Sequence, residues 1–237
     1  MDSDRRTAIV AGVLFIIATV ASIASTAATS PILTASDYLS KVNANQNQVI
    51  LGAILQFIAS VASASIAISL YPILRRYREG LALGSVGFRI VEAVFGVVAA
   101  LGLMSLVTLS QNFVNAGSPP GSDYQTLGTL IKAVINWSSF VFLALAFTLG
   151  ALLYYYIFYR SKLVPQWLSA WGLVAAAMSL SAALWTAFSG DFLSTTVVVL
   201  NIPIGVQEMV LAVWLIVKGF TLPVRGSAPA AMTTTNL

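Results

Sequence analysis

The sequence contains no cysteine and no histidine, and only 8% of its residues are charged. Without cysteine the chain can form no disulfide, thiol redox relay or thiolate metal site. Without histidine it has no imidazole to ligate haem or zinc, or to shuttle protons near neutral pH. These absences exclude haem-bearing membrane cytochromes, zinc intramembrane proteases, quinone-coupled thiol oxidases and histidine-dependent acyltransferases. We therefore expect no cofactor and no bound metal.

Hydrophobic residues are abundant instead. They make up 58% of the 237 residues and are gathered in long runs. Each run is close to or above the ~20 residues needed to cross ~30 Å of hydrocarbon. Because a bilayer offers the backbone no water to bond with, each run predicts a helix. The predicted spans cover residues 8–28, 48–70, 85–110, 131–158, 167–188 and 202–220.

These spans predict an all-α, polytopic membrane protein in which residues 1–220 form a six-transmembrane-helix bundle. The first outer loop contains residues 36–42, which can form a brief interfacial helix capped by Ser36. Residues 221–237 are rich in Ala, Thr and Pro and have no apolar period. We expect them to form a disordered cytoplasmic tail.

The basic residues predict the orientation of the bundle. With six spans, nine of the twelve Lys and Arg residues fall on one side of the membrane. The positive-inside rule places that side, and both termini with it, in the cytoplasm. The basic excess is therefore a membrane signal, and we expect no nucleic-acid partner. Arg75, Arg76 and Arg78 lie between the second and third spans, where they are expected to attract anionic lipid headgroups.

Three ionisable residues lie inside predicted spans, at a cost of about 2.5–3.5 kcal/mol each on insertion scales. Arg89 and Glu92 are three residues apart and share one helix face. Glu208 lies ~15 Å from the cytoplasmic end of the last span, at a depth similar to that of Glu92. We hypothesise that the third and sixth spans are neighbours and that Arg89 bridges the two glutamates. The cluster is either structural, fixing helix register, or functional, as a proton-titrating or anion-binding site.

Four more residues are candidates for the same site. Gln207 adjoins Glu208, while Gln56 and Asn136 lie in the second and fourth spans. Either of the last two can instead make a single interhelical hydrogen bond. Pro203 either begins the last helix, where its missing amide costs nothing, or breaks a longer helix that starts near residue 197. The first alternative is preferred, although transporters use broken helices to line substrate sites.

Two further patterns have simpler interpretations. Aromatic residues close the fourth span and begin the fifth, and they are interpreted as a belt at the cytoplasmic interface: Tyr154, Tyr155, Tyr156, Tyr159, Trp167 and Trp171. Small residues, including Ser60 and Ser63, fill the second span and are interpreted as a surface on which helices pack closely.

Motifs spread along most of the chain resemble one family. They are Arg6-Thr7-Ala8 with Ala11-Gly12, residues 70–74, residues 88–92, residues 163–168, and Gln207-Glu208 followed by residues 212–220. Together they are similar to an uncharacterised family of prokaryotic integral membrane proteins, the domain-of-unknown-function family 4386. The resemblance implies six helices in a prokaryotic plasma membrane and places Arg89, Glu92 and Glu208 on family motif positions. It implies no activity, substrate or cofactor.

Three classes of function remain. The first is a small carrier or channel-like protein for an unknown solute or protons, with the charged residues as its site. The second is a non-transport accessory or structural protein whose charges only fix helix packing. An intramembrane enzyme is least favoured, because Asp37, Asp123 and Asp191 lie at the outer side or in loops and no serine sits in a nucleophile motif. Self-association into a homo-oligomer stays open.

Overall fold

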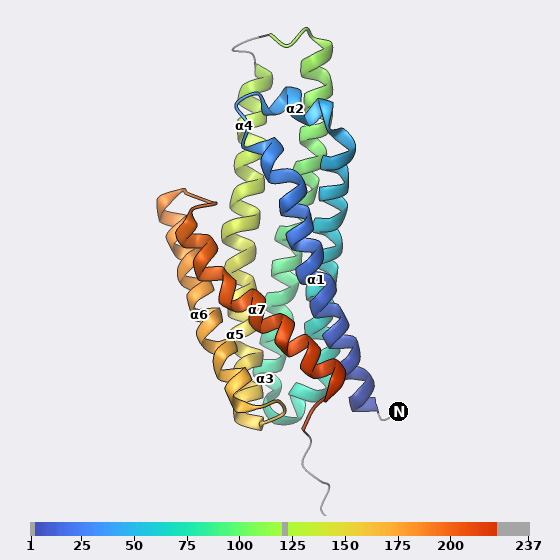
Figure 1. Ribbon diagram of the computed structural model, residues 1–237, viewed down its shortest axis with the longest axis vertical. Helices are drawn as coiled ribbons and strands as arrows, with labels where there is room; N and C mark the ends of the chain where they lie inside the picture. The colour runs from blue at the N-terminus through green and yellow to red at the C-terminus, as the bar shows by residue number, and fades with distance from the viewer. Residues whose placement is uncertain (1–2, 120–122, 222–237) are drawn as a thin grey trace, which may run out of the picture.

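The computed structural model describes residues 3–119 and 123–221. These residues are almost entirely helical and contain no β-strand, which confirms the predicted all-α fold. In chain order the elements (Figure 1) are α1 (Ser3–Leu33), α2 (Tyr38–Ala44), α3 (Gln46–Asn115), α4 (Asp123–Asn136), the π-helix η1 (Trp137–Phe142), α5 (Leu143–Ser161), α6 (Gln166–Ser189) and α7 (Thr195–Val217).

Five helical stretches of the described chain are long and apolar enough to cross a membrane. They are α1, α3, the continuous run Asp123–Ser161 made of α4, η1 and α5, then α6, and α7. Each helical stretch begins before the apolar run that it contains, since polar residues at a helix end can reach water without ending the helix. The chain is therefore a membrane protein built of long apolar helices.

α3 contains two of the predicted spans within a single element of 70 residues. The sequence predicts a loop between residues 70 and 85, but the helix continues on both sides of one break at Arg78, where φ is −151° and ψ is 87°. The chain reverses there into two arms that lie side by side (Figure 1). Ser63 on the first arm hydrogen-bonds to both Arg89 and Glu92 on the second.

Both ends of the described chain lie at the end of the bundle that carries Arg78, which we call the Arg78 end (Figure 1). Asp4 of α1 forms an ion pair with Arg76 of α3, with a shortest N–O distance of 2.8 Å. The backbone amide of Thr221 donates to the carbonyl of Leu163, between α5 and α6, at 2.8 Å. These contacts tie four segments that are far apart in the sequence into one closed end.

Arg5 caps the C-terminus of α7 at this same end. Its guanidinium donates to the carbonyls of Leu215, Ile216 and Val217 at 3.0, 2.6 and 3.1 Å. Those carbonyls have no partner within the helix and carry the negative end of its dipole, so a cation is favourable there. Gly219 has a φ of +75°, and a Cβ at this position would lie 2.9 Å from Arg5 Nη1. Glycine is therefore needed both for the backbone turn and for room for the arginine.

Replacing Arg5 by glutamine should lower the free energy of unfolding by about 1–3 kcal/mol, because a charged donor group is lost from three carbonyls. Thermal unfolding of the purified protein in detergent measures the effect. Arg6→Gln is the matched control, since the neighbouring Arg6 side chain is exposed and should tolerate the same change. Equal melting temperatures for the two variants would show that Arg5 does not hold α7 in place.

Two apolar cores are stacked along the bundle. With 24 and 23 residues, α6 and α7 are each ~35 Å long, against ~47 Å for the 31 residues of α1. They therefore contribute only to the first core, at the Arg78 end, whose buried residues include Phe15, Ile66, Tyr154, Phe158 and Leu211. The second core lies at the opposite end, where α2 packs on α3, and includes Ile32, Leu39, Val49, Leu106 and Ile135.

Pro203 does not begin the last helix, so the preferred interpretation of this residue is wrong. α7 begins at Thr195, and the Ser194 hydroxyl caps it by accepting from the amide of Val197 at 3.3 Å. The helix then continues through Pro203 without a break. Because proline has no N–H, the carbonyl of Val199 four residues earlier loses its helical partner.

Two smaller expectations concern the ends of elements. α2 (Tyr38–Ala44) corresponds to the brief helix predicted in the first outer loop, but Ser36 does not cap it. Asp37 stands at the N-cap and makes no side-chain capping hydrogen bond, so packing of Leu39 and Val42 into the second core holds this helix instead. Beyond residue 221, the predicted tail lies outside the described residues.

Candidate functional site

Arg89 lies between Glu92 and Glu208, and these three residues are called the Arg–Glu cluster below. Arg89 Nη1 is 3.1 Å from Glu92 Oε2, and Arg89 Nη2 is 3.5 Å from Glu208 Oε1. The side chains of Arg89, Glu92 and Glu208 are only 2%, 8% and 11% exposed. The predicted bridge from Arg89 to both glutamates is therefore present, and it is buried.

The helices around the cluster are arranged differently from the prediction. α3 packs mainly on α1 and α5, while α7 packs on α1 and α6. The third and last spans are therefore not close neighbours along their lengths, as the sequence suggested. Arg89 still reaches Glu208 because its long side chain spans the gap between the two helices, with 3.5 Å from Nη2 to Glu208 Oε1.

The hydrogen bonds of Arg89 go to Glu92 and not to Glu208. Nη1 donates to Ser63 Oγ at 2.7 Å and to the two oxygens of Glu92 at 3.4 and 3.1 Å. Nη2 donates to the hydroxyl of Tyr154 at 3.0 Å. The Ser63 hydroxyl in turn donates to Glu92 Oε1 at 2.6 Å. Arg89 and Glu92 thus form a compact, hydrogen-bonded pair in which the two charges offset each other.

Glu208 is the less satisfied carboxylate of the cluster. Within the described part of the chain its Oε1 accepts no hydrogen bond, and Arg89 approaches it only as an ion pair at 3.5 Å. Its Oε2 accepts one long hydrogen bond, from Thr19 at 3.5 Å. A buried carboxylate normally has several short hydrogen bonds, so Glu208 is left with unused accepting capacity.

Aromatic rings surround the guanidinium on the side of α5. The Arg89 Cζ atom lies 4.6 Å from the ring centre of Phe147 and 5.4 Å from that of Tyr154. Both distances are within the range of a cation–π contact, which is strongest where water is excluded. The position of the arginine is therefore fixed by two rings as well as by its hydrogen bonds.

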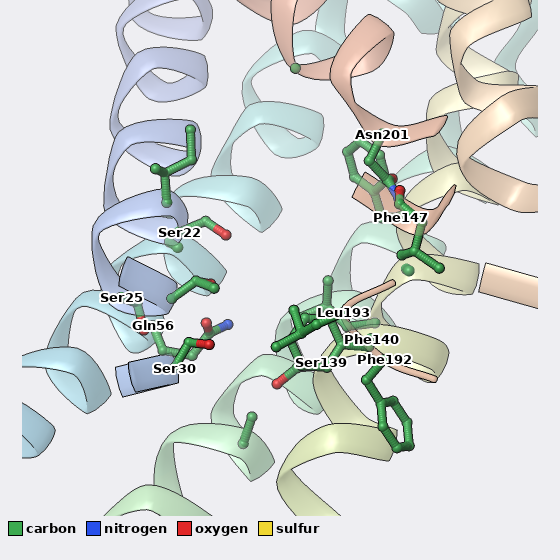
Figure 2. Close-up of a pocket in the computed structure, with 18 of the residues that line it drawn as sticks. Ser22, Ser25, Ser30, Gln56, Ser139, Phe140, Phe147, Phe192, Leu193 and Asn201 are labelled. Atoms are coloured by element: carbon green, nitrogen blue, oxygen red, sulfur yellow. The ribbon is translucent and has the colours of Figure 1, made fainter. Parts of the chain in front are cut away.

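A cavity of about 1100 Å³ begins at the cluster and extends away from the Arg78 end. Along α1 its lining residues run from Ala18 to Thr34, and every long helix contributes to its wall. Gln56 and Asn136, both predicted as contributors, line this cavity, whereas Pro203 does not. Figure 2 shows residues of α1 and α3 on one side facing residues of η1, α7 and the α6–α7 loop on the other: Ser22, Ser25, Ser30 and Gln56 opposite Ser139, Phe140, Leu193 and Asn201.

The chain matches a family described as a domain of unknown function, DUF4386, over residues 10–219. The protein belongs to this family. The match includes the whole Arg–Glu cluster and the helices that build the cavity, and it gives them no activity. No curated protein and no solved structure matches the chain.

Gln207 is not part of the cluster, contrary to expectation. Its side chain is fully buried between α5 and α6, where Nε2 donates to the carbonyl of Leu168 at 3.1 Å and Oε1 accepts from the Tyr155 hydroxyl. Neighbouring residues on a helix point about 100° apart, so Gln207 and Glu208 face different partners. Gln207 joins three helices in the first core.

Three features of the site were not predicted. Tyr154 and Tyr155 of the predicted aromatic belt are fully buried, whereas Tyr156, Tyr159 and Trp167 are exposed as an interfacial belt requires. Ser63 was interpreted as a packing residue, yet it contacts both charges. A signal existed for Ser63, which lies seven residues after Gln56 and therefore on the same helix face. The π-helix η1, whose Ser139 and Phe140 line the cavity, has no composition that marks it in the sequence.

The group available for chemistry is the Glu208 carboxylate, which lies at the bottom of a cavity with both polar and apolar walls. With all three residues ionised, the cluster carries one positive and two negative charges. In the part of the chain that the structure describes, no group of three or more Asp or Glu residues could hold a metal ion. The single negative charge of ionised Glu208 can be offset there by a proton or a monovalent cation.

Proposed function

We propose that this protein is a small membrane carrier that binds a solute or protons at the Arg–Glu cluster. In this proposal α1, the two arms of α3, the α4–α5 run, α6 and α7 make six crossings of the prokaryotic plasma membrane. The Arg78 end, with both termini, faces the cytoplasm. Basic residues at that end support this orientation: Arg5, Arg6, Arg75, Arg76, Arg78, Arg160, Lys162 and Lys218.

The observation that carries the proposal is a buried charge cluster at the closed end of an open cavity. Exposed residues such as Thr34, Gly190 and Asp191 border the far end of the cavity, away from the Arg78 end. Below the cluster, the first core and the contacts of Arg5 and Asp4 close the path. A site reachable from one side only is one of the two states that alternating access requires.

The turn between the arms of α3 is the proposed contact with lipid headgroups. Arg75, Arg76 and Arg78 are all exposed there, and Arg76 also pairs with Asp4. A juxtamembrane basic group attracts the anionic lipids of the cytoplasmic leaflet, worth about 1 kcal/mol per residue near the surface.

An accessory or structural protein is the alternative, favoured by the completeness of the Arg89–Glu92–Ser63 hydrogen bonding. In that case the charges would only specify which helices pack together. The alternative gives no role to the cavity or to the unused oxygen of Glu208. A measurement of function in variants that keep the fold separates the two.

The test is proton flux into proteoliposomes, followed with a pH-sensitive dye in the lumen. We expect Glu208→Gln and Glu92→Gln to reduce the flux of the unmodified protein to that of empty liposomes, because glutamine keeps the shape of each side chain and removes its titratable group. Size-exclusion profiles check the fold. If both variants lose folded protein, the cluster is structural and the accessory function replaces the carrier.

A further inference from the structure

We infer that the solute is an organic monovalent cation, a protonated amine with an apolar body, whose ammonium group binds Glu208. The inference rests on the proposed carrier function and names its substrate class. It follows from the distribution of charge in the cluster, from the hydrogen bonding of Glu208 and from the character of the cavity walls.

Charge alone favours a cation over an anion. Arg89 gives its short hydrogen bonds to Ser63, Glu92 and Tyr154, so its charge is offset mainly by Glu92. Its Nε has no hydrogen-bond partner among the described residues, but two carboxylates lie beside the single guanidinium. With both glutamates ionised, an added anion would therefore face a net negative cluster. A monovalent cation would make it neutral.

Glu208 has the geometry to receive that cation. It is 92% buried as a residue and still lines the cavity, at the end where α1 and α7 approach each other. Its one hydrogen bond in the described structure comes from Thr19, at 3.5 Å. An ammonium group has three donors and no acceptor, so it can donate to the carboxylate and to the Thr19 hydroxyl together.

The cavity walls fit an apolar body better than a fully hydrated ion. Above Glu208 the cavity is bordered by hydrophobic side chains of four helices and of the α6–α7 loop: Ile23, Phe140, Phe147, Leu193, Val198 and Ile202. Its volume of about 1100 Å³ is slightly above the ~300–1,000 Å³ of typical pockets for small organic ligands. Hydroxyl and amide groups, such as those of Ser22 and Asn201, can hydrogen-bond to polar substituents.

Charges at the mouth do not reverse this preference. Lys132 and Asp191 both border the cavity there and have opposite signs. The Lys132 ammonium lies 4.1 Å from the ring centre of Tyr38 and is held by it. Selection for a cation therefore depends on Glu208, at the bottom.

The test is binding of 2-phenylethylammonium to the purified full-length protein in lipid nanodiscs, measured by isothermal titration calorimetry. Two probes of similar size serve as controls: neutral 2-phenylethanol and anionic 3-phenylpropionate. We expect the ammonium probe to bind most tightly. Glu208→Gln should raise its Kd about 10- to 100-fold, the value of a hydrogen bond to a charged group. Glu79→Gln makes the same chemical change at an exposed position on the α3 turn and should leave the Kd unchanged.

A third variant keeps the proposed function and the substrate class separable. A Cβ on Gly205 would meet nothing within 4 Å, and Gly205 lines the cavity, so the bulky side chain of Gly205→Trp should occupy cavity volume. If all three probes bind equally and Gly205→Trp abolishes their binding, the cavity is a solute site but the cation inference is overturned. If the ammonium probe does not bind while flux still depends on Glu208, the inference again fails and proton carriage stands. If Glu208→Gln loses the preference for the cation and Glu79→Gln keeps it, the inference is confirmed.

Discussion

Replacing Arg89 by glutamine should remove about 3–5 kcal/mol of stability, the usual cost of deleting one partner of a buried ion pair. Among the described residues, Glu92 would then keep the hydrogen bond from Ser63, and Glu208 would lose its ion pair with Arg89. A loss of this size is a large fraction of the total stability of most proteins. We expect little folded Arg89→Gln protein after detergent extraction, measured by size-exclusion recovery and by thermal unfolding.

The double variant Arg89→Gln/Glu92→Gln provides the control. It removes the pair as a unit, so no uncompensated charge remains at Glu92, and it should recover much of the lost stability. If the double variant is as unstable as the single one, packing of the arginine on Phe147 and Tyr154 matters more than its charge.

Cross-linking Asp4 to Arg76 through introduced cysteines should abolish proton flux in proteoliposomes. These residues join α1 to the turn of α3 across the closed end of the bundle, and that end must open if the cluster is to reach the cytoplasm. An arginine–carboxylate pair is longer than a disulfide, so the link requires a short bifunctional thiosulfonate reagent. The chain has no cysteine of its own, so Asp4→Cys/Arg76→Cys is modified at the intended pair alone.

Reduction of the link should restore the flux, which separates locking from damage by the two substitutions. Asp37→Cys/Lys41→Cys is the matched pair, since it replaces an ion pair between the N-cap residue of α2 and Lys41 within that helix, at the opposite end, where a link restrains no helix pair. Full flux in the linked Asp4–Arg76 protein would mean that this contact does not open during transport.

The charged centre of this site could be predicted because its residues are rare and costly. Few ionisable side chains lie in the apolar runs, and a buried charge needs a partner, so Arg89 had few choices besides Glu92 and Glu208. The all-α fold followed from the same physics, since a long apolar run in lipid has to satisfy its own backbone.

The neutral partners could not be predicted in the same way. Ser63, Thr19 and Tyr154 belong to residue types that pack, hydrogen-bond or border a membrane with similar ease, so only the three-dimensional arrangement selects their role. The continuation of α7 upstream of Pro203 depends on the cap at Ser194 and on packing against α1 and α6. Both the break at Arg78 and the π-helix η1 are local changes in backbone geometry that composition does not encode.

The single-residue turn at Arg78 also bears on how the chain enters the membrane during synthesis. In the proposed arrangement of six crossings, the second arm of α3 brings two charges into the membrane, and a neutral partner of both, Ser63, lies on the first arm. The first arm leaves the ribosome earlier, so it is already present when Arg89 and Glu92 arrive. With hardly any loop between them, the arms can enter as one helical hairpin in which the arginine, the glutamate and the serine are joined before either charge faces lipid.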